Sequence, residues 1–428
     1  MISKLFYLPF FLIFYKYEYF IITALIFGLL FITNLCEVKI NRFFLKISFL
    51  SFLIARLISG FNLNISNIWF NLSQMNYSLA GRFIDMQSVF WSLNCNSEII
   101  GQYSMYGSEQ ILNCPYNISY GPLFELISIK NNALFSTFLI TTVAFLLIYL
   151  YFIDSLSKYD NKNSYIFTLC MFSPPVNFIL ERMNFDIIIY ITIFITYTKI
   201  KNHYIKNFIF FLLAMLKYYP IFLILGNLIF KLVKRQKSEI LPDILGIILF
   251  SLYLSYYSFH NSILNQPVRP FRSDRTFGIL SDSLNISNIF KTDYKLNYIF
   301  LVLIILLTIL FIMKEFKYSN LFENNKNHNL IFMFISLSLF ANYDYRLAFL
   351  ILIFSSISKA VNKHIFISYY IFIFSSPSLM HAYGSNFQLI ENYNLIFIDI
   401  VFYFFISNLI LEYIFFIKTN KNISQNQT

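Results

Sequence analysis

Charged residues are scarce in this chain. Only 12% of its 428 residues are charged and 58% are hydrophobic. In a soluble domain, about a quarter of the residues are usually charged. Glycine and proline are also few, at 10 each. There is no glycine-rich phosphate loop, no Asp-x-Asp and no Cys/His spacing typical of zinc. We therefore exclude a soluble enzyme of the P-loop type, and we expect neither a cofactor nor a metal.

Long apolar runs recur from end to end, and no soluble domain or linker interrupts them. A membrane span needs about 20 apolar residues, and re-entrant segments need fewer. We therefore predict one all-α polytopic membrane domain over residues 1–428, with about 11–14 transmembrane or re-entrant helices. The expected membrane segments are Leu5–Tyr15, Tyr19–Leu35, Ile47–Phe61, Ala133–Ile153, Tyr165–Leu180, Ile187–Thr198, Asn207–Leu216, Ile221–Phe230, Ile240–Phe259, Asn297–Met313, Asn329–Phe340, Leu347–Ser358, Ile365–Ser376 and Leu395–Ile417.

Basic residues indicate the orientation of these segments, because cytoplasmic loops carry an excess of Lys and Arg. Most of the 32 basic residues fall on one side only if residues 207–230 form a hairpin that is broken at Lys217-Tyr218-Tyr219-Pro220. Proline supports such a break, because it removes a helical hydrogen bond. The +11 net charge is then explained by cytoplasmic loops, including a tail at 418–428, and it does not indicate a nucleic-acid partner.

The remaining polar motifs fall on the opposite, outer side. They lie in a long loop at 62–132, in a second loop at 260–296 and in three short hairpins. Charged groups near a membrane usually line a cavity or pair with each other, so we predict one aqueous site at the outer boundary. The motifs are Gly81-Arg82-Phe83-Ile84-Asp85, Tyr120-Gly121-Pro122, Glu181-Arg182-Met183-Asn184-Phe185-Asp186, Leu216-Lys217-Tyr218-Tyr219-Pro220, Arg269-Pro270-Phe271-Arg272-Ser273-Asp274-Arg275 and Asn342-Tyr343-Asp344-Tyr345-Arg346.

Three of these motifs together resemble the GT-C superfamily of membrane glycosyltransferases. They are Asp85 with the later Tyr-Gly-Pro, the Arg-x-Asn-x-Asp hairpin and Leu-Lys-Tyr-Tyr-Pro, and they are most similar to glycosyltransferase family 87, the polyprenol-phosphate-mannose-dependent enzymes. The likeness covers roughly residues 61–234. Two features depart from the family pattern. The helices expected within residues 1–46 are additional, and Asp85 stands without an adjacent second acid.

The resemblance implies an inverting transfer of a hexose, mannose-like, from a polyprenyl phosphate to a hydroxyl of a lipid, glycan or protein acceptor. Asp85 would be the general base, and Arg182, Lys217 and Arg346 would stabilise the leaving phosphate. Other residues expected to bind substrate are Arg82, Glu181, Asn184, Asp186, Tyr218, Asp344, Arg269 and Arg272. We expect the chain to reside in a bacterial inner membrane, with its site facing outward.

Plainer interpretations stay open for each of these residues. Asp85 and Arg82 would lie one helical turn apart and could simply pair, Asp344 and Arg346 could bond only to each other, and Lys217 could extend to the interface on its long stem. Cys95 and Cys114 share the first outer loop, where a disulfide is plausible outside the cytoplasm.

Two other functions compete with sugar transfer. An oligosaccharide polymerase or ligase would use Arg269, Arg272 and Arg275 to hold a lipid pyrophosphate. A transporter or flippase would show repeated halves, and no internal repeat is evident in the sequence.

Overall fold

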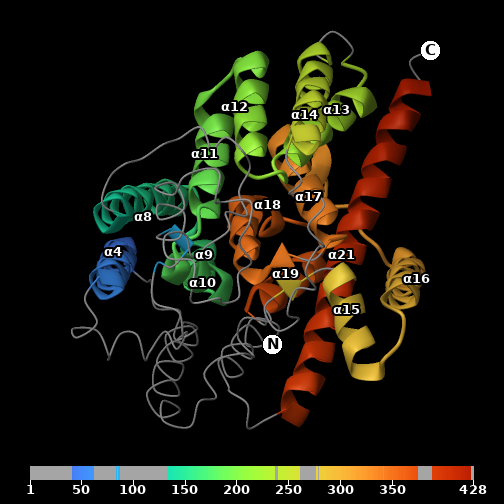
Figure 1. The fold of residues 1–428 in the computed structure, drawn as a ribbon. Coiled ribbons are helices and arrows are strands. Elements are labelled where there is room, and N and C mark those ends of the chain that lie inside the picture. The colour runs from blue at the N-terminus through green and yellow to red at the C-terminus, as the bar shows by residue number, and fades with distance from the viewer. Residues whose placement is uncertain are drawn as a thin grey trace.

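The protein is mostly helical in a computed structural model (Figure 1), which describes residues 41–61, 83, 85–86, 133–236, 240–260, 276–277, 279–340, 342–374 and 388–425. The first half contains α4 (Arg42–Phe61), α8 (Ala133–Ser157), α9 (Asn161–Met171), α10 (Pro174–Arg182), α11 (Asp186–Lys199), α12 (His203–Leu216) and α13 (Ile221–Val233). The second half contains α14 (Leu241–His260), β1 (Thr276–Phe277), α15 (Ile279–Phe290), α16 (Tyr294–Met313), the 3₁₀ helix η5 (Leu321–Glu323), α17 (Asn325–Ser338), β2 (Asn342–Tyr343), the 3₁₀ helix η6 (Asp344–Ile353), α18 (Phe354–Ile357), α19 (Lys363–Phe374) and α21 (Gln388–Gln425).

Three described helices are long and apolar enough to cross a membrane. These segments are Phe135–Ser157 in α8, Tyr294–Met313 in α16 and Ile400–Asn420 in α21. Much of the apolar surface of α8, α14 and α16 faces outward, and Phe311 on α16 is 84% exposed. Soluble monomers rarely expose contiguous apolar patches of this kind, so the surface favours contact with lipid.

Helices α11 to α14 lie side by side, while α21 runs along the far side of the molecule from α4 and α8 (Figure 1). The expected hairpin at residues 207–230 is confirmed: α12 ends at Leu216, and α13 begins after Pro220. Proline fits the start of a helix, because the first turn leaves its N–H groups without helical partners. Lys217 is therefore held in a turn between two short apolar helices.

Three expected elements differ from the structure. The single segment at 165–180 is two helices, α9 and α10, because Pro174 and Pro175 occupy the first turn of a new helix after Ser173. Residues 347–358 form η6 and α18 rather than one α-helix. The expected tail at 418–428 continues α21 as far as Gln425.

The second outer loop, 260–296, also contains structure that the sequence did not predict. Helix α15 lies within it, and Thr276 pairs antiparallel with Tyr343 while Phe277 pairs with Asn342. This pairing joins the second outer loop, at Thr276 and Phe277, to the segment that leads into Arg346. The expected helices within residues 1–40 lie outside the described residues.

The position of Asp85 depends on the packing of Phe83, two residues earlier, against α4. The Phe83 ring is buried and packs edge-on against Phe145 of α8, with ring centroids 6.2 Å apart. A side chain added at Gly60 on α4 would overlap this ring. Glycine at position 60 therefore makes room for the ring that anchors the backbone two residues before Asp85.

We expect Gly60→Val to displace Phe83 and to lower the free energy of unfolding by about 1–3 kcal/mol, the usual cost of overpacking. The measurement is the thermal unfolding of detergent-purified protein. Ala55→Val, at a partly exposed position on the same helix, is the control and should change stability little. Equal stability of the two variants would contradict this packing.

Candidate functional site

The connection between α10 and α11 places three polar side chains close together. Met183 ends α10 in a left-handed conformation, with φ of 46°, and its N–H bonds to the carbonyl oxygens of the preceding helical turn. This turn leaves Arg182 at the end of one helix and Asp186 at the start of the next. Asn184 lies between them, and its Oδ1 accepts a hydrogen bond of 3.0 Å from the backbone N–H of Asp186.

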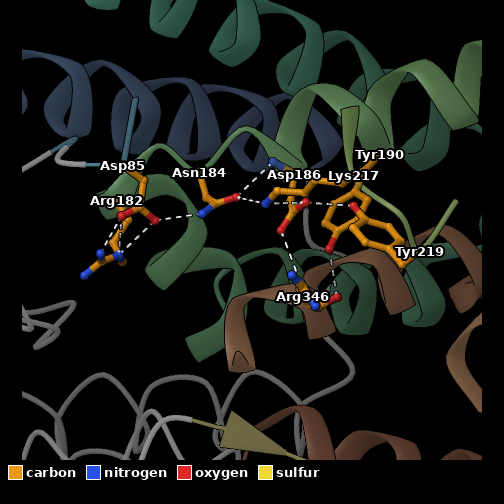
Figure 2. A network of polar contacts seen from close by, with 8 residues as sticks. All are labelled: Asp85, Arg182, Asn184, Asp186, Tyr190, Lys217, Tyr219 and Arg346. Carbon is orange, nitrogen blue, oxygen red and sulfur yellow. Dashed lines mark hydrogen bonds and ion pairs between the residues drawn. The ribbon is translucent and has the colours of Figure 1, made fainter. Parts of the chain in front are cut away.

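Asp85 lies against this connection and forms a forked ion pair with Arg182 (Figure 2). The Arg182 Nε donates to both carboxylate oxygens at 2.9 Å, and Nη2 also contacts Oδ1. The Nδ2 of Asn184 donates to Oδ2 at 2.7 Å. A forked arginine contact is strong and directional. It therefore fixes the orientation of the Asp85 carboxylate, although Arg182 lies 97 residues later in the sequence.

Asp186 is the centre of a second cluster, and it is fully buried. Its Oδ1 lies 2.9 Å from the Lys217 Nζ and accepts a hydrogen bond of 2.8 Å from the Tyr219 hydroxyl. Its Oδ2 lies 3.6 Å from the Arg346 Nε. Lys217 also donates to the Oδ1 of Asn184 at 3.0 Å. Asn184 therefore joins the two clusters into one network.

Arg346 enters the network from η6. The hydroxyl of Tyr190 on α11 donates to the backbone carbonyl of Arg346 at 3.2 Å, and the guanidinium lies 5.3 Å from the centre of the Tyr219 ring. This backbone bond and the ring contact orient the arginine toward Asp186 (Figure 2). Elements from residues 85 to 346 thus converge on one place.

Among the described side chains, the network contains two carboxylates, Asp85 and Asp186, and three cations, Arg182, Lys217 and Arg346. The Asp85 side chain is 14% exposed, whereas that of Asp186 is 0% exposed. Ligand can therefore reach Asp85, while Asp186 serves as an internal anchor for the cations.

Burial also changes the acid–base properties of the turn after α12. Burial lowers the pKa of the Lys217 ammonium, and the nearby Asp186 carboxylate opposes this effect. Burial, followed by the same carboxylate, raises the pKa of the Tyr219 hydroxyl well above its ordinary value. Tyr219 therefore stays protonated and remains a hydrogen-bond donor to Asp186 at any physiological pH.

An apolar cavity of about 60 Å³ adjoins the network. It lies among α8, α9, α10, α11 and η6, and Ile187 and Tyr190 of its wall belong to the first turns of α11, next to Asp186. The cavity thus places an apolar space beside a cationic one.

The structure brings together Asp85, Arg182, Asn184, Asp186, Lys217 and Arg346, all of which the sequence nominated. Tyr218 is 39% exposed, and its ring lies 6.5 Å from that of Phe250 on α14, away from Asp186. Several nominated side chains lie outside the described residues or are not described within them: Arg82, Glu181, Arg269, Arg272 and Asp344. Arg275, Cys95 and Cys114 also fall outside.

Sequence reasoning missed Tyr219, Tyr190 and Arg56. Lys217 has an extended backbone, with φ of −146° and ψ of 132°, and alternate residues of an extended segment share a side. That periodicity could have favoured Tyr219 over Tyr218 as the tyrosine that joins Lys217 at Asp186. Arg56 is a buried cation of α4 that donates to the Asn177 Oδ1 on α10 at 3.0 Å, and nothing in its apolar surroundings signalled it.

A further buried carboxyl lies away from this network. Asp282 of α15 is buried, and the Tyr403 hydroxyl donates to it at 2.5 Å. Burial raises the pKa of Asp282 to about 7, although the Tyr403 hydrogen bond lowers it. The folded protein therefore holds this proton over a pH range in which the unfolded chain has lost it.

Because the unfolded state releases this proton near pH 4, the contribution of Asp282 to the free energy of unfolding falls as pH rises from about 4 to 7. We expect Asp282→Asn to lack this dependence. As pH rises from about 4 to 7, the melting temperature of the variant should therefore increase relative to that of the wild type. Thermal unfolding measured at several pH values tests this prediction. Parallel curves for the two proteins would show that the carboxyl titrates normally.

Among the described residues, no group of three or more His, Cys, Asp or Glu side chains could hold a metal ion. No protein family, curated protein or solved structure matches this chain.

Proposed function

We propose that this protein is a multi-pass, GT-C-type glycosyltransferase that moves a hexose from a polyprenyl phosphate to an acceptor hydroxyl. The network of Figure 2 carries the proposal: one accessible carboxylate, Asp85, stands beside three cations and next to an apolar cavity. This combination suits a donor with a phosphate head and a hydrocarbon tail.

In the proposed reaction, the acceptor oxygen attacks the anomeric carbon and the bond to the phosphate oxygen breaks. The acceptor loses its proton to Asp85, and the polyprenyl phosphate leaves as an anion. Asp85 suits this role better than Asp186, because only Asp85 is exposed to an incoming hydroxyl. In this proposal an acceptor hydroxyl would take the place of one of the four hydrogen bonds that the Asp85 carboxylate accepts from Arg182 and Asn184.

The cations suit the leaving group. Negative charge develops on the phosphate as the glycosidic bond breaks, and preorganised cations stabilise it in a site with little water. Lys217 is held by Asp186 and Asn184, and Arg346 by Tyr190 and Tyr219. Both cations are therefore positioned before the substrate arrives.

The outer surface fits a lipid-linked donor. Apolar side chains of α8, α14 and α16 face outward, and the apolar cavity beside α11 lies next to the network. Both features suit a donor that carries a hydrocarbon tail. The expected orientation places this site on the outer face of a bacterial inner membrane, with the basic loops in the cytoplasm.

The experiment that tests the proposal measures transfer of radiolabelled hexose from synthetic polyprenyl phosphates. Membranes that contain the chain are compared with matched membranes that lack it. Chain-dependent appearance of label in a lipid, glycan or protein product supports the proposal. Absence of transfer by correctly folded protein from mannosyl, glucosyl and galactosyl donors would overturn it.

A further inference from the structure

A second polar space lies at the other end of α11 and α12. It is a pocket of about 180 Å³ between α11, α12, α13 and the start of α17. Tyr197, near the end of α11, and His203, at the start of α12, line it, whereas Asp186 and Lys217 lie at the opposite ends of the same helices. A cavity needs only about 10–15 Å³ to hold one water, so this pocket has room for a ligand of several atoms.

Cations line the pocket without accompanying acids. Lys206 and Lys326 are among its lining residues, and no Asp or Glu is. Burial lowers the pKa of Lys326 to about 8, and repulsion from Lys158 contributes to this shift. Within the described part of the chain, neither lysine forms an ion pair. The Asp154 carboxylate, which is not part of the lining, partly opposes the shift of Lys326, and a bound anion would supply a counter-charge within the pocket itself.

A buried ion pair outside the pocket holds two of its asparagine side chains in place. Asn207 and Asn227 each donate to the Oδ1 of Asp243 at 2.5 Å, and the Oδ2 of this buried carboxylate lies 2.9 Å from the Lys231 Nζ. Asn227 in turn accepts a hydrogen bond of 2.8 Å from Asn325. The Lys231–Asp243 ion pair therefore fixes the wall of the pocket, although neither residue lines the pocket itself.

The start of α17 adds a partial positive charge. Asn324 caps this helix by accepting from the Lys326 N–H at 2.9 Å, and both residues line the pocket. The aligned peptide dipoles of a helix give its start a partial positive charge. Together with two lysines, it forms a combination that suits the oxygens of a phosphate.

We propose that this pocket binds a phosphate group, carried either by a soluble molecule or by the headgroup of an anionic lipid. The site is separate from the network around Asp85 and does not depend on the transferase activity. In the expected orientation it faces the cytoplasmic side, where the basic loops lie. It would give the protein a ligand on the face opposite to its proposed substrate.

Two arms of one experiment distinguish the sources of the phosphate. In the first, purified full-length protein in detergent is tested for binding of radiolabelled inorganic phosphate by equilibrium dialysis. In the second, its melting temperature is compared in nanodiscs of phosphatidylcholine and in nanodiscs that also contain phosphatidylglycerol. Binding in the first arm identifies a soluble phosphate, and stabilisation in the second identifies a headgroup.

The double variant Lys206→Gln/Lys326→Gln should bind about a hundredfold more weakly, because each charge-assisted contact contributes roughly tenfold in affinity. Lys201→Gln, at an exposed lysine in the connection between α11 and α12, is the matched control and should bind like wild type. Asn325→Asp adds a negative charge to the pocket and should also abolish phosphate binding. This variant tests the proposal if the double variant does not fold.

Wild-type protein that neither binds phosphate nor is stabilised by phosphatidylglycerol would overturn the proposal. Wild-type affinity in a folded Asn325→Asp variant would overturn it as well.

Discussion

Replacing Asp85 with asparagine is expected to lower sugar transfer by about 10²- to 10⁴-fold, the usual contribution of a general base. Asparagine keeps the shape of the side chain, and its Oδ1 still accepts a hydrogen bond from Arg182, but it cannot take a proton from the acceptor hydroxyl. The measurement is the rate of hexose transfer in membranes with matched amounts of each protein.

Asp154→Asn is the matched control for this substitution. Asp154 is 48% exposed and pairs with Lys158 on the surface of α8, so its loss should leave transfer unchanged. Asp85→Glu keeps a carboxylate and should retain part of the activity, which Asp85→Asn should not. Full transfer by Asp85→Asn would remove Asp85 from the chemistry and leave it as a partner that orients Arg182.

The second large effect concerns stability. Lys217→Met should lower the free energy of unfolding by about 3–5 kcal/mol, because it leaves the buried carboxylate of Asp186 without its closest cation. Both side chains are nearly inaccessible, with exposures of 7% for Lys217 and 0% for Asp186. Water therefore cannot replace the lost partner, and Arg346 is farther away, at 3.6 Å.

A double-mutant cycle separates the pair from its parts. Asp186→Asn alone should also destabilise, whereas Asp186→Asn/Lys217→Met removes both charges and should recover much of the loss. Lys158→Met breaks an exposed pair and should cost less than about 1 kcal/mol. Thermal or denaturant unfolding in detergent gives these values. Additive losses in the double variant would argue against a direct interaction between Asp186 and Lys217.

The local elements of this site could be predicted from sequence because their causes are local. Pro220 separates α12 from α13, and the apolar runs on either side set the lengths of these helices. The same principle, applied to Pro174 and Pro175, could have divided the segment at 165–180 into α9 and α10. The long apolar run concealed that break, since hydropathy alone does not show where a helix restarts.

The pairings within the site could not be predicted in the same way. Arg182 contacts Asp85 across 97 residues, and Arg346 reaches Asp186 from η6. Such contacts depend on how helices pack, which a single sequence leaves open. The sequence indicated that these charges share one side of the membrane, but it did not show that Asn184 links two clusters or that Asp186 is sealed from solvent.

The short helices on which the site is built affect how it meets a bilayer. α11 and α12 have 14 residues each and α13 has 13, so each is about 20 Å long, whereas the hydrocarbon core of a bilayer is about 30 Å thick. In the proposed multi-pass arrangement, a bilayer crossed by these helices would thin or dip around them. The site would then bind the phosphate of the proposed donor closer to the centre of the bilayer than the lipid headgroups usually lie. The thickness of the membrane would therefore influence the affinity for the donor.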